Sequence, residues 1–127
     1  MTNATACVRA PSTGDPCPRC DLLLGLEGVV HVEGVERTDG HMRVEVSTAS
    51  QLMGCPDCGV VAPSRGRRVR RLPDVPHGST RVVLLWRQRV WRCPDPACAR
   101  GTFTEQVPDL VRARGSVTAR AVAWAME

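Results

Sequence analysis

The chain has 127 residues, which is enough for one small domain, and only 3% of them are aromatic. A core built on valine, leucine and alanine is thin at this size, so a metal or another cross-link is expected to support it. The 17 basic residues are all arginine, the formal net charge is +4, and no apolar run approaches a membrane span or the apolar part of a signal peptide. We therefore expect a cytoplasmic protein with no membrane partner.

The first half of the chain predicts a leader and one hairpin. Residues 1–21 are irregular and rich in small polar residues and proline, which predicts a flexible leader. From residue 22 onward, apolar and polar residues begin to alternate, most clearly at Met42, Val44 and Val46, as in a half-buried strand. Two strands are expected around Asp39-Gly40, a pair suited to a type I′ turn.

The second half predicts another hairpin and a helix. Strands are expected over residues 66–72 and 80–93, separated by two prolines and a His-Gly-Ser turn. The segment 116–127 predicts a short helix capped by Ser116 or Thr118. The expected fold is small α+β, mainly β, with antiparallel hairpins and a short C-terminal helix. Residues 22–107 would form one domain, and residues 108–127 would be a linker and the start of a helical element.

Four cysteines form an ordered set in the second half. Cys55 and Cys58 are two residues apart, and Cys93 and Cys98 follow after a gap of 34 residues. A Cys-x2-Cys loop can turn around one ion, and Gly59 suits the positive φ that such a loop needs. The intervening hairpin would bring the second loop back beside the first, which is the arrangement of a zinc ribbon. Four thiolates close a tetrahedral site, so the expected cofactor is a structural Zn²⁺.

Other interpretations of these cysteines stay open. Iron fits the same four sulfurs, and the sequence does not separate it from zinc. A redox pair is a second alternative, but such a pair usually begins a helix, and the residues after Cys58 do not favour one. Free thiols in a core are a third. Cys7, Cys17 and Cys20 could form a second site with a histidine, although the leader has no matching second pair.

The arginines gather after the first cysteine pair. Residues 1–54 hold four arginines against seven acids, and residues 55–127 hold thirteen against six. This asymmetry favours an acidic partner, with nucleic acid first, because the guanidinium fork suits phosphate. The alternative is a solvated face, or arginines paired with Asp74 and Glu105. The candidate DNA-binding residues lie on the two strands of the second hairpin: Arg65, Arg67, Arg68, Arg70, Arg71, Arg87 and Arg89.

The two tryptophans of the longest predicted strand are more typical of packing than of base stacking. Trp86 and Trp91 are five residues apart, so they lie on opposite faces of a regular strand. That spacing leaves room for one of them to be exposed.

Three ordered segments resemble the N-terminal zinc-finger region of ISL-three type insertion-sequence transposases. They are CPDCG, SRGRRVRRLPDVPHG and RVVLLWRQRVWRCPDPACARGTFTEQVP, and the resemblance extends over about residues 22–127. It places Cys55, Cys58, Cys93 and Cys98 on the family's zinc ligands. It places Asp74, Pro76, Phe103 and Glu105 on the family's other signature positions.

The resemblance implies a DNA-binding module of a transposase. In the family the finger precedes a helix-turn-helix, which residues 116–127 resemble in part, and a catalytic domain for which this chain has no room. We therefore expect a bacterial, nucleoid-associated protein that binds duplex DNA at transposon ends and is catalytically inactive alone. The alternatives are an interaction or inhibitory module that pairs with a full-length transposase or with itself, and a nonfunctional truncated fragment.

Overall fold

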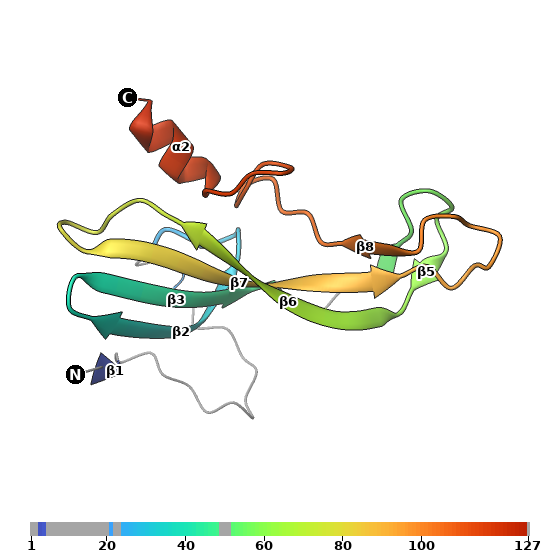
Figure 1. Ribbon diagram of the computed structural model, residues 1–127, viewed down its shortest axis with the longest axis horizontal. Helices are drawn as coiled ribbons and strands as arrows, with labels where there is room; N and C mark the ends of the chain where they lie inside the picture. Colours follow the sequence, from blue (N-terminus) through green and yellow to red (C-terminus); the bar gives the residue numbers. More distant parts are fainter. Residues whose placement is uncertain (1–2, 5–20, 22–23, 49–51, 127) are drawn as a thin grey trace.

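The fold is one strongly twisted sheet with a small second hairpin at one end and a helix near the other (Figure 1). The computed structural model describes residues 3–4, 21, 24–48 and 52–126. The main sheet has the order β1-β2-β3-β7-β6, with β8 paired to β7, and β4 and β5 form a separate two-stranded sheet. The elements are β1 (Asn3–Ala4), β2 (His31–Thr38), β3 (His41–Ser47), β4 (Met53–Gly54), β5 (Val61–Ala62), β6 (Ser64–Pro73), β7 (Arg81–Arg92), β8 (Thr102–Thr104) and α2 (Ala119–Ala125).

The first predicted hairpin is β2 and β3. Alternation places Met42, Val44 and Val46 in the core, while the residues between them are exposed. The turn lies at Asp39 and Gly40 as expected, but it is not of type I′. Gly40 has a φ of 70°, and among the described non-glycine residues only Arg114 has a positive φ. Asp39 therefore has a negative φ, whereas type I′ needs positive φ at both central residues.

The second predicted hairpin is β6 and β7, which pair antiparallel from Ser64↔Trp91 to Pro73↔Val83. The sequence did not predict how the two hairpins join. β3 and β7 pair in parallel, from His41↔Arg81 to Val46↔Trp86, so β7 lies inside the sheet between β3 and β6. A central position explains why β7 is the most apolar of the long strands.

The sheet buries opposite faces at its two ends. Val82, Leu84 and Trp86 of β7 belong to a core with residues of β2 and β3, whereas Trp91 and Cys93 belong to a second core beside β8. Alternation puts these two groups on opposite faces of β7. Both tryptophans are buried, with 1% and 3% of their surface exposed, so neither is the exposed one that their spacing allowed.

The two cores meet at Gln88 and Arg89, which are both buried. The amide of Gln88 donates to the Glu105 carbonyl at 2.7 Å. The Arg89 guanidinium donates to the Thr48 carbonyl at 2.8 Å, and the Glu105 carboxylate accepts from the Arg89 backbone N–H and from the Thr48 hydroxyl. These bonds pair most of the polar groups where neither apolar core covers the strand, while the buried Nε of Arg89 has no hydrogen-bond partner and lies 4.0 Å from the Glu105 carboxylate.

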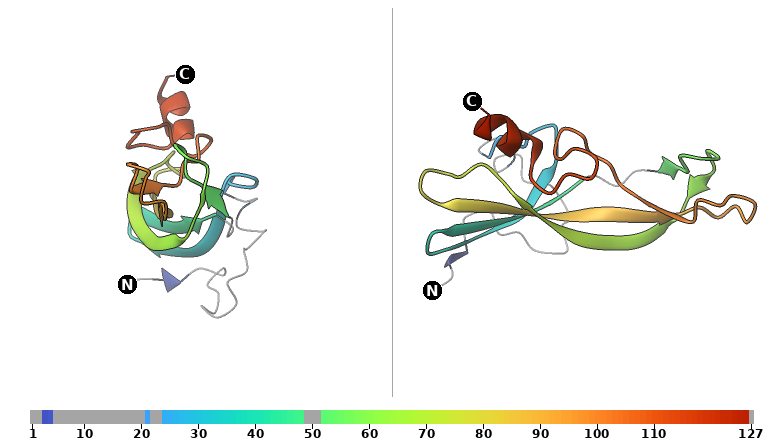
Figure 2. Two further views of the ribbon diagram at one scale, coloured as in Figure 1. Left: turned by 90° about the vertical axis from the view of Figure 1, so that its right-hand side faces the viewer. Right: turned by 45° about the horizontal axis from the view of Figure 1, so that its top comes forward.

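The C-terminal segment packs across the first core and ends in α2 (Figure 2). Leu110 and Val111 lie in that core. The expected helix over residues 116–127 is shorter in the structure, because Thr118 is the N-cap and its hydroxyl accepts from the Ala121 N–H at 3.2 Å. One of the two expected caps is thereby confirmed.

Asp74 fastens this segment to the sheet. Its carboxylate is fully buried and accepts from the Thr118 hydroxyl at 2.7 Å and from two nitrogens of the Arg120 guanidinium. Arg120 also donates to the Leu24 carbonyl at 2.6 Å, and the Thr118 N–H donates to the Pro73 carbonyl at 3.1 Å. The first turn of α2 is therefore held to the end of β6.

The part of the leader that the structure describes contacts the sheet. Asn3 and Ala4 pair with Arg37 and Glu36 of β2. Asp21 is buried, and its carboxylate accepts from the Val32 N–H at 2.7 Å. The predictions for Cys7, Cys17 and Cys20 lie outside the described residues.

Candidate metal centre and basic surface

The first cysteine pair lies on the turn between β4 and β5. The Gly59 N–H donates to the Cys55 carbonyl and the Cys55 N–H donates to the Val60 carbonyl, each at 2.8 Å. Gly59 has a φ of 79°, which confirms the positive φ expected there. This tight turn directs both sulfurs to the same side. No helix begins directly after Cys58, so this pair lacks the helix N-terminus at which a redox cysteine usually lies.

The second pair lies on the loop between β7 and β8. The Cys93 N–H donates to the Gly101 carbonyl at 2.8 Å, and the Cys98 N–H donates to the Asp95 carbonyl at 3.0 Å. The stacked rings of Trp91 and Phe103, 5.6 Å apart between centroids, support this loop from the sheet side. An ion pair of 3.8 Å between Arg100 and Asp57 joins the two loops at the surface.

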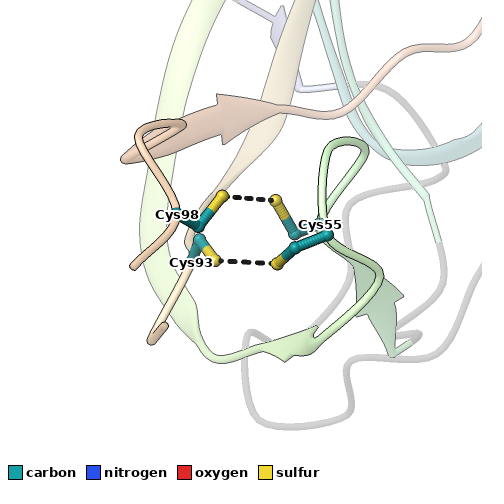
Figure 3. Close-up of side chains that lie close together, drawn as sticks. Cys55, Cys93 and Cys98 are labelled. Atoms are coloured by element: carbon teal, nitrogen blue, oxygen red, sulfur yellow. Dashed lines mark hydrogen bonds between the residues drawn. The ribbon is translucent and has the colours of Figure 1, made fainter. Parts of the chain in front are cut away.

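The four sulfurs converge at the end of the sheet (Figure 3). All four Sγ atoms lie within 4.8 Å of one another. The Cys55–Cys98 and Cys58–Cys93 sulfur distances are 3.8 and 3.5 Å. A tetrahedral zinc with bonds of about 2.3 Å needs sulfurs about 3.8 Å apart, so the donor set fits Zn²⁺. The predicted metal ligands are thus brought together by both hairpins.

The four thiols do not ionise alike. Burial raises the pKa of Cys55, but the backbone N–H groups of Cys58 and Asp57 outweigh it and lower the pKa to about 7. The Asp95 N–H acts to lower the pKa of Cys93, but burial and the neighbouring sulfurs raise it to about 12. The Cys55 thiolate therefore makes the Cys93 thiolate harder to form. A divalent cation that replaces the protons removes this repulsion, which is the chemistry of a four-thiolate zinc site.

A family model described as the zinc-finger of transposase IS204/IS1001/IS1096/IS1165 matches residues 51–98. This segment is therefore similar to the zinc finger of ISL-three type transposases, as the sequence resemblance predicted. The match holds all four cysteines and Asp74, and it covers less of the chain than the resemblance over residues 22–127. No curated protein and no solved structure matches the chain significantly.

The zinc ribbon is a non-catalytic module. Four sulfurs fill the coordination of a tetrahedral ion, so no position stays open for a substrate or an activated water. The ion would hold together two loops whose apolar residues form one small cluster. Among the described helices, none is long and apolar enough to cross a membrane.

The arginines predicted to bind DNA fall on two faces of the β6–β7 hairpin. Arg68 and Arg70 lie on the face of the first core, and both have partners within the chain. Arg68 donates to the Gln88 side chain at 2.8 Å, and Arg70 donates to the Gly115 carbonyl at 2.6 Å above the Trp86 ring. The Arg68 contact joins the two strands of the hairpin, and the Arg70 contact joins the hairpin to the C-terminal segment.

The opposite face, which we call the outer face, carries Arg67 and Arg71 of β6 and Arg87 of β7. Glu33 of β2 lies near two of them, at 3.3 Å from Arg87 and 4.0 Å from Arg67. Arg65 is exposed at the bulge where β6 begins. These arginines point to solvent from both strands and form one basic surface.

Arg89 is placed differently from the other predicted DNA-binding arginines. It is 8% exposed and bonded to Thr48 and Glu105 at the junction of the two cores. Burial lowers its pKa, and the nearby Arg67 adds to this effect. The suggestion that hairpin arginines pair with Glu105 therefore fits Arg89, whereas Asp74 pairs with Arg120 of α2.

Two nitrogen-bearing side chains of the outer face were not among the predicted DNA-binding residues. His41 and Arg81 lie opposite each other on β3 and β7. The parallel pairing that brings them together could not be inferred from local patterns, so no sequence signal marked them.

Proposed function

We propose that the zinc ribbon binds duplex DNA at transposon ends through the outer face of its β6–β7 hairpin. The observation that supports this proposal is the outer-face cluster of Arg67, Arg71 and Arg87, with Arg65 at its margin. Arginine on an exposed sheet can follow a phosphate backbone with bidentate hydrogen bonds. The match to a transposase zinc finger supports nucleic acid as the partner.

The zinc ion would contribute to DNA binding by fixing the shape of the hairpin. By holding the loops after β4 and β7 together, the ion would fix the end of the hairpin from which β6 starts. Glu33 would compete with phosphate for Arg67 and Arg87, but exposed ion pairs contribute little, so DNA can replace it. A protein with this role would be found in the bacterial cytoplasm with the nucleoid, and it would need a separate catalytic domain for strand transfer.

A matched pair of double variants tests this proposal. Arg71→Ala with Arg87→Ala removes two charges from the outer face, and Arg112→Ala with Arg114→Ala removes two exposed charges from the C-terminal segment. The first pair is expected to weaken binding of a labelled duplex by about tenfold or more in fluorescence anisotropy, and to flatten its salt dependence. The control pair should have a much smaller effect. Equal losses in both would mean that only net charge matters, and binding that ignores salt would contradict the proposal.

The edge of the sheet favours a second candidate function, pairing with an acidic segment of another protein such as a full-length transposase. Because Asp74 donates its N–H to Val82, the backbone groups of Arg67, Val69 and Arg71 point away from β7, toward the open edge of β6. Val69 is 64% exposed there. An extended acidic chain could add to this edge as a strand.

A proline separates the two candidates. Val69→Pro removes one outward N–H and leaves the bonds to β7 in place. Strand addition should be lost in this variant, as measured by pull-down with a transposase or by self-association in sedimentation. DNA binding through side chains should persist. Loss of DNA binding with an intact fold would instead favour a role for the edge itself.

A further inference from the structure

A groove lies at the end of the sheet that is remote from the cysteines. It has a volume of about 280 Å³, and its walls include His41, Arg71, Arg81, Pro73 and Val83. Three strands contribute, because His41 is on β3, Arg71 and Pro73 are on β6, and Arg81 and Val83 are on β7. The groove thus continues the outer face beyond Arg71.

The register explains why these side chains gather there. His41 lies opposite Arg81, and Pro73 lies opposite Val83, two residues along the same strand. Residues two apart share a face, so Arg71, Pro73, Val83 and Arg81 all project to the outer side of the sheet. The parallel pairing of β3 and β7 adds the imidazole of His41 to the two guanidinium groups.

The positive charge of the groove is not neutralised within the described part of the chain. In those residues the side chains of Arg71, Arg81 and His41 form no hydrogen bond or ion pair. The acid in the groove wall is Asp74, and its carboxylate is occupied by Thr118 and Arg120. A groove lined by two arginines whose side chains have no counter-charge favours an anion, and guanidinium donors suit phosphate.

We propose that this groove binds one phosphate of a nucleic-acid backbone, with Arg81 and Arg71 as donors and His41 at its margin. The apolar wall formed by Pro73 and Val83 suits the sugar beside that phosphate. The inference rests on the proposed DNA-binding function and extends it, because it adds Arg81 and His41 to the contact surface and fixes the end of the hairpin where the backbone passes.

The test combines NMR with binding measurements on the zinc-loaded protein. Titration with a duplex oligonucleotide should shift the side-chain signals of His41 and the amide signal of Val83 in a saturable way. Arg81→Gln should weaken duplex binding about tenfold, as expected for loss of a charged hydrogen bond, and lower the salt slope by about one unit. Arg112→Gln removes the same charge elsewhere and should change affinity much less. Unchanged thermal unfolding would show that Arg81→Gln folds.

Other outcomes overturn the inference in distinguishable ways. If the wild-type duplex affinity is high but Arg81→Gln matches Arg112→Gln and His41 does not shift, the groove is not a contact and the proposed function survives. If the duplex fails to bind at low salt, the proposed function fails. If inorganic phosphate shifts His41 and the duplex does not, the groove is a free-anion site and the assignment to a nucleic-acid backbone is wrong.

Discussion

The two ends of the sheet are stabilised in different ways. The end that contains β2, β3 and the first half of β7 buries a continuous set of aliphatic side chains beneath the C-terminal segment. The other end has only a small apolar cluster around Trp91 and Phe103, and its two loops bring four sulfurs together. A single strand, β7, belongs to both cores with opposite faces. The comparison indicates that the first end can fold by burial, whereas the second depends on the ion.

Cys93→Ser should have the largest effect, because it removes a buried zinc ligand. The cysteine loops and the β4–β5 hairpin should lose protection from hydrogen exchange, while the core around Trp86 keeps most of its own. Metal analysis should show loss of bound zinc. Cys17→Ser is the control among the cysteines outside the four. An unchanged thermal transition and full zinc content in Cys93→Ser would contradict a structural metal.

Leu84→Ala tests the apolar end. Leu84 is 1% exposed, and truncation of such a residue should cost about 2–5 kcal/mol of unfolding free energy in chemical denaturation. Zinc content should stay at one ion per chain when the variant is folded. If this variant loses zinc at concentrations of denaturant where its core is intact, the two ends are more strongly coupled than we infer.

Asp74→Asn tests the attachment of α2 and should cost about 2 kcal/mol, because a buried charged network loses its acceptor charge. Burial raises the pKa of Asp74, but the bonds from Arg120 and Thr118 outweigh it, and the net shift is downward. The network therefore stabilises the fold fully above the ordinary carboxyl pKa, and this contribution is lost as pH falls through the lower folded-state pKa. Unfolding curves from pH 7 to pH 2 should show this loss in the wild type and not in Asp74→Asn.

A matched glycine pair should give the smallest effects. Gly59 and Gly40 both have positive φ, and a Cβ at either position would meet no atom within 4 Å. Alanine should therefore cost about 1 kcal/mol at each position, from backbone strain alone. Gly59→Ala should weaken zinc affinity in a chelator competition, and Gly40→Ala should not. Equal zinc affinities would show that the first cysteine loop tolerates a change of backbone geometry.

Local patterns predicted the parts of the fold that depend on local physics. Alternation located β3, the turn before it located β2, and a β-rich run located the long β7. Cysteine spacing predicted the cluster of four sulfurs, and Thr118, one of the two caps offered, begins α2. The prediction of a type I′ turn was wrong, because Gly40 has a positive φ and Asp39 does not. The parallel pairing of β3 and β7 depends on contacts between distant segments, which no local pattern specifies.

The contacts that the arginines make could not be predicted from the sequence. Alternation along a strand puts Arg68 and Arg70 on one face and Arg67 and Arg71 on the other, but it could not show that Arg70 would reach Gly115 or that Arg89 would be buried against Glu105. These partners lie 45 and 16 residues away. The same limit applies to Trp91. A strand whose buried face changes partway along has a sequence pattern like that of a strand with one exposed face, so the sequence could not show that Trp91 is buried. The basic surface is therefore smaller than the arginine count suggested, and it includes Arg81.

β7 also sets the distance between the cationic groove and the cysteine cluster. Its twelve residues span about 40 Å at the rise of an extended strand, and the hydrogen bonds on both sides keep it from bending freely. The cationic groove lies at its first residues and the zinc ligands at its last. One turn of duplex DNA measures about 34 Å, so both ends could meet the same side of a double helix one turn apart. The length of β7 would then set the distance between the two DNA contacts, and insertion of residues into β7 would change that distance.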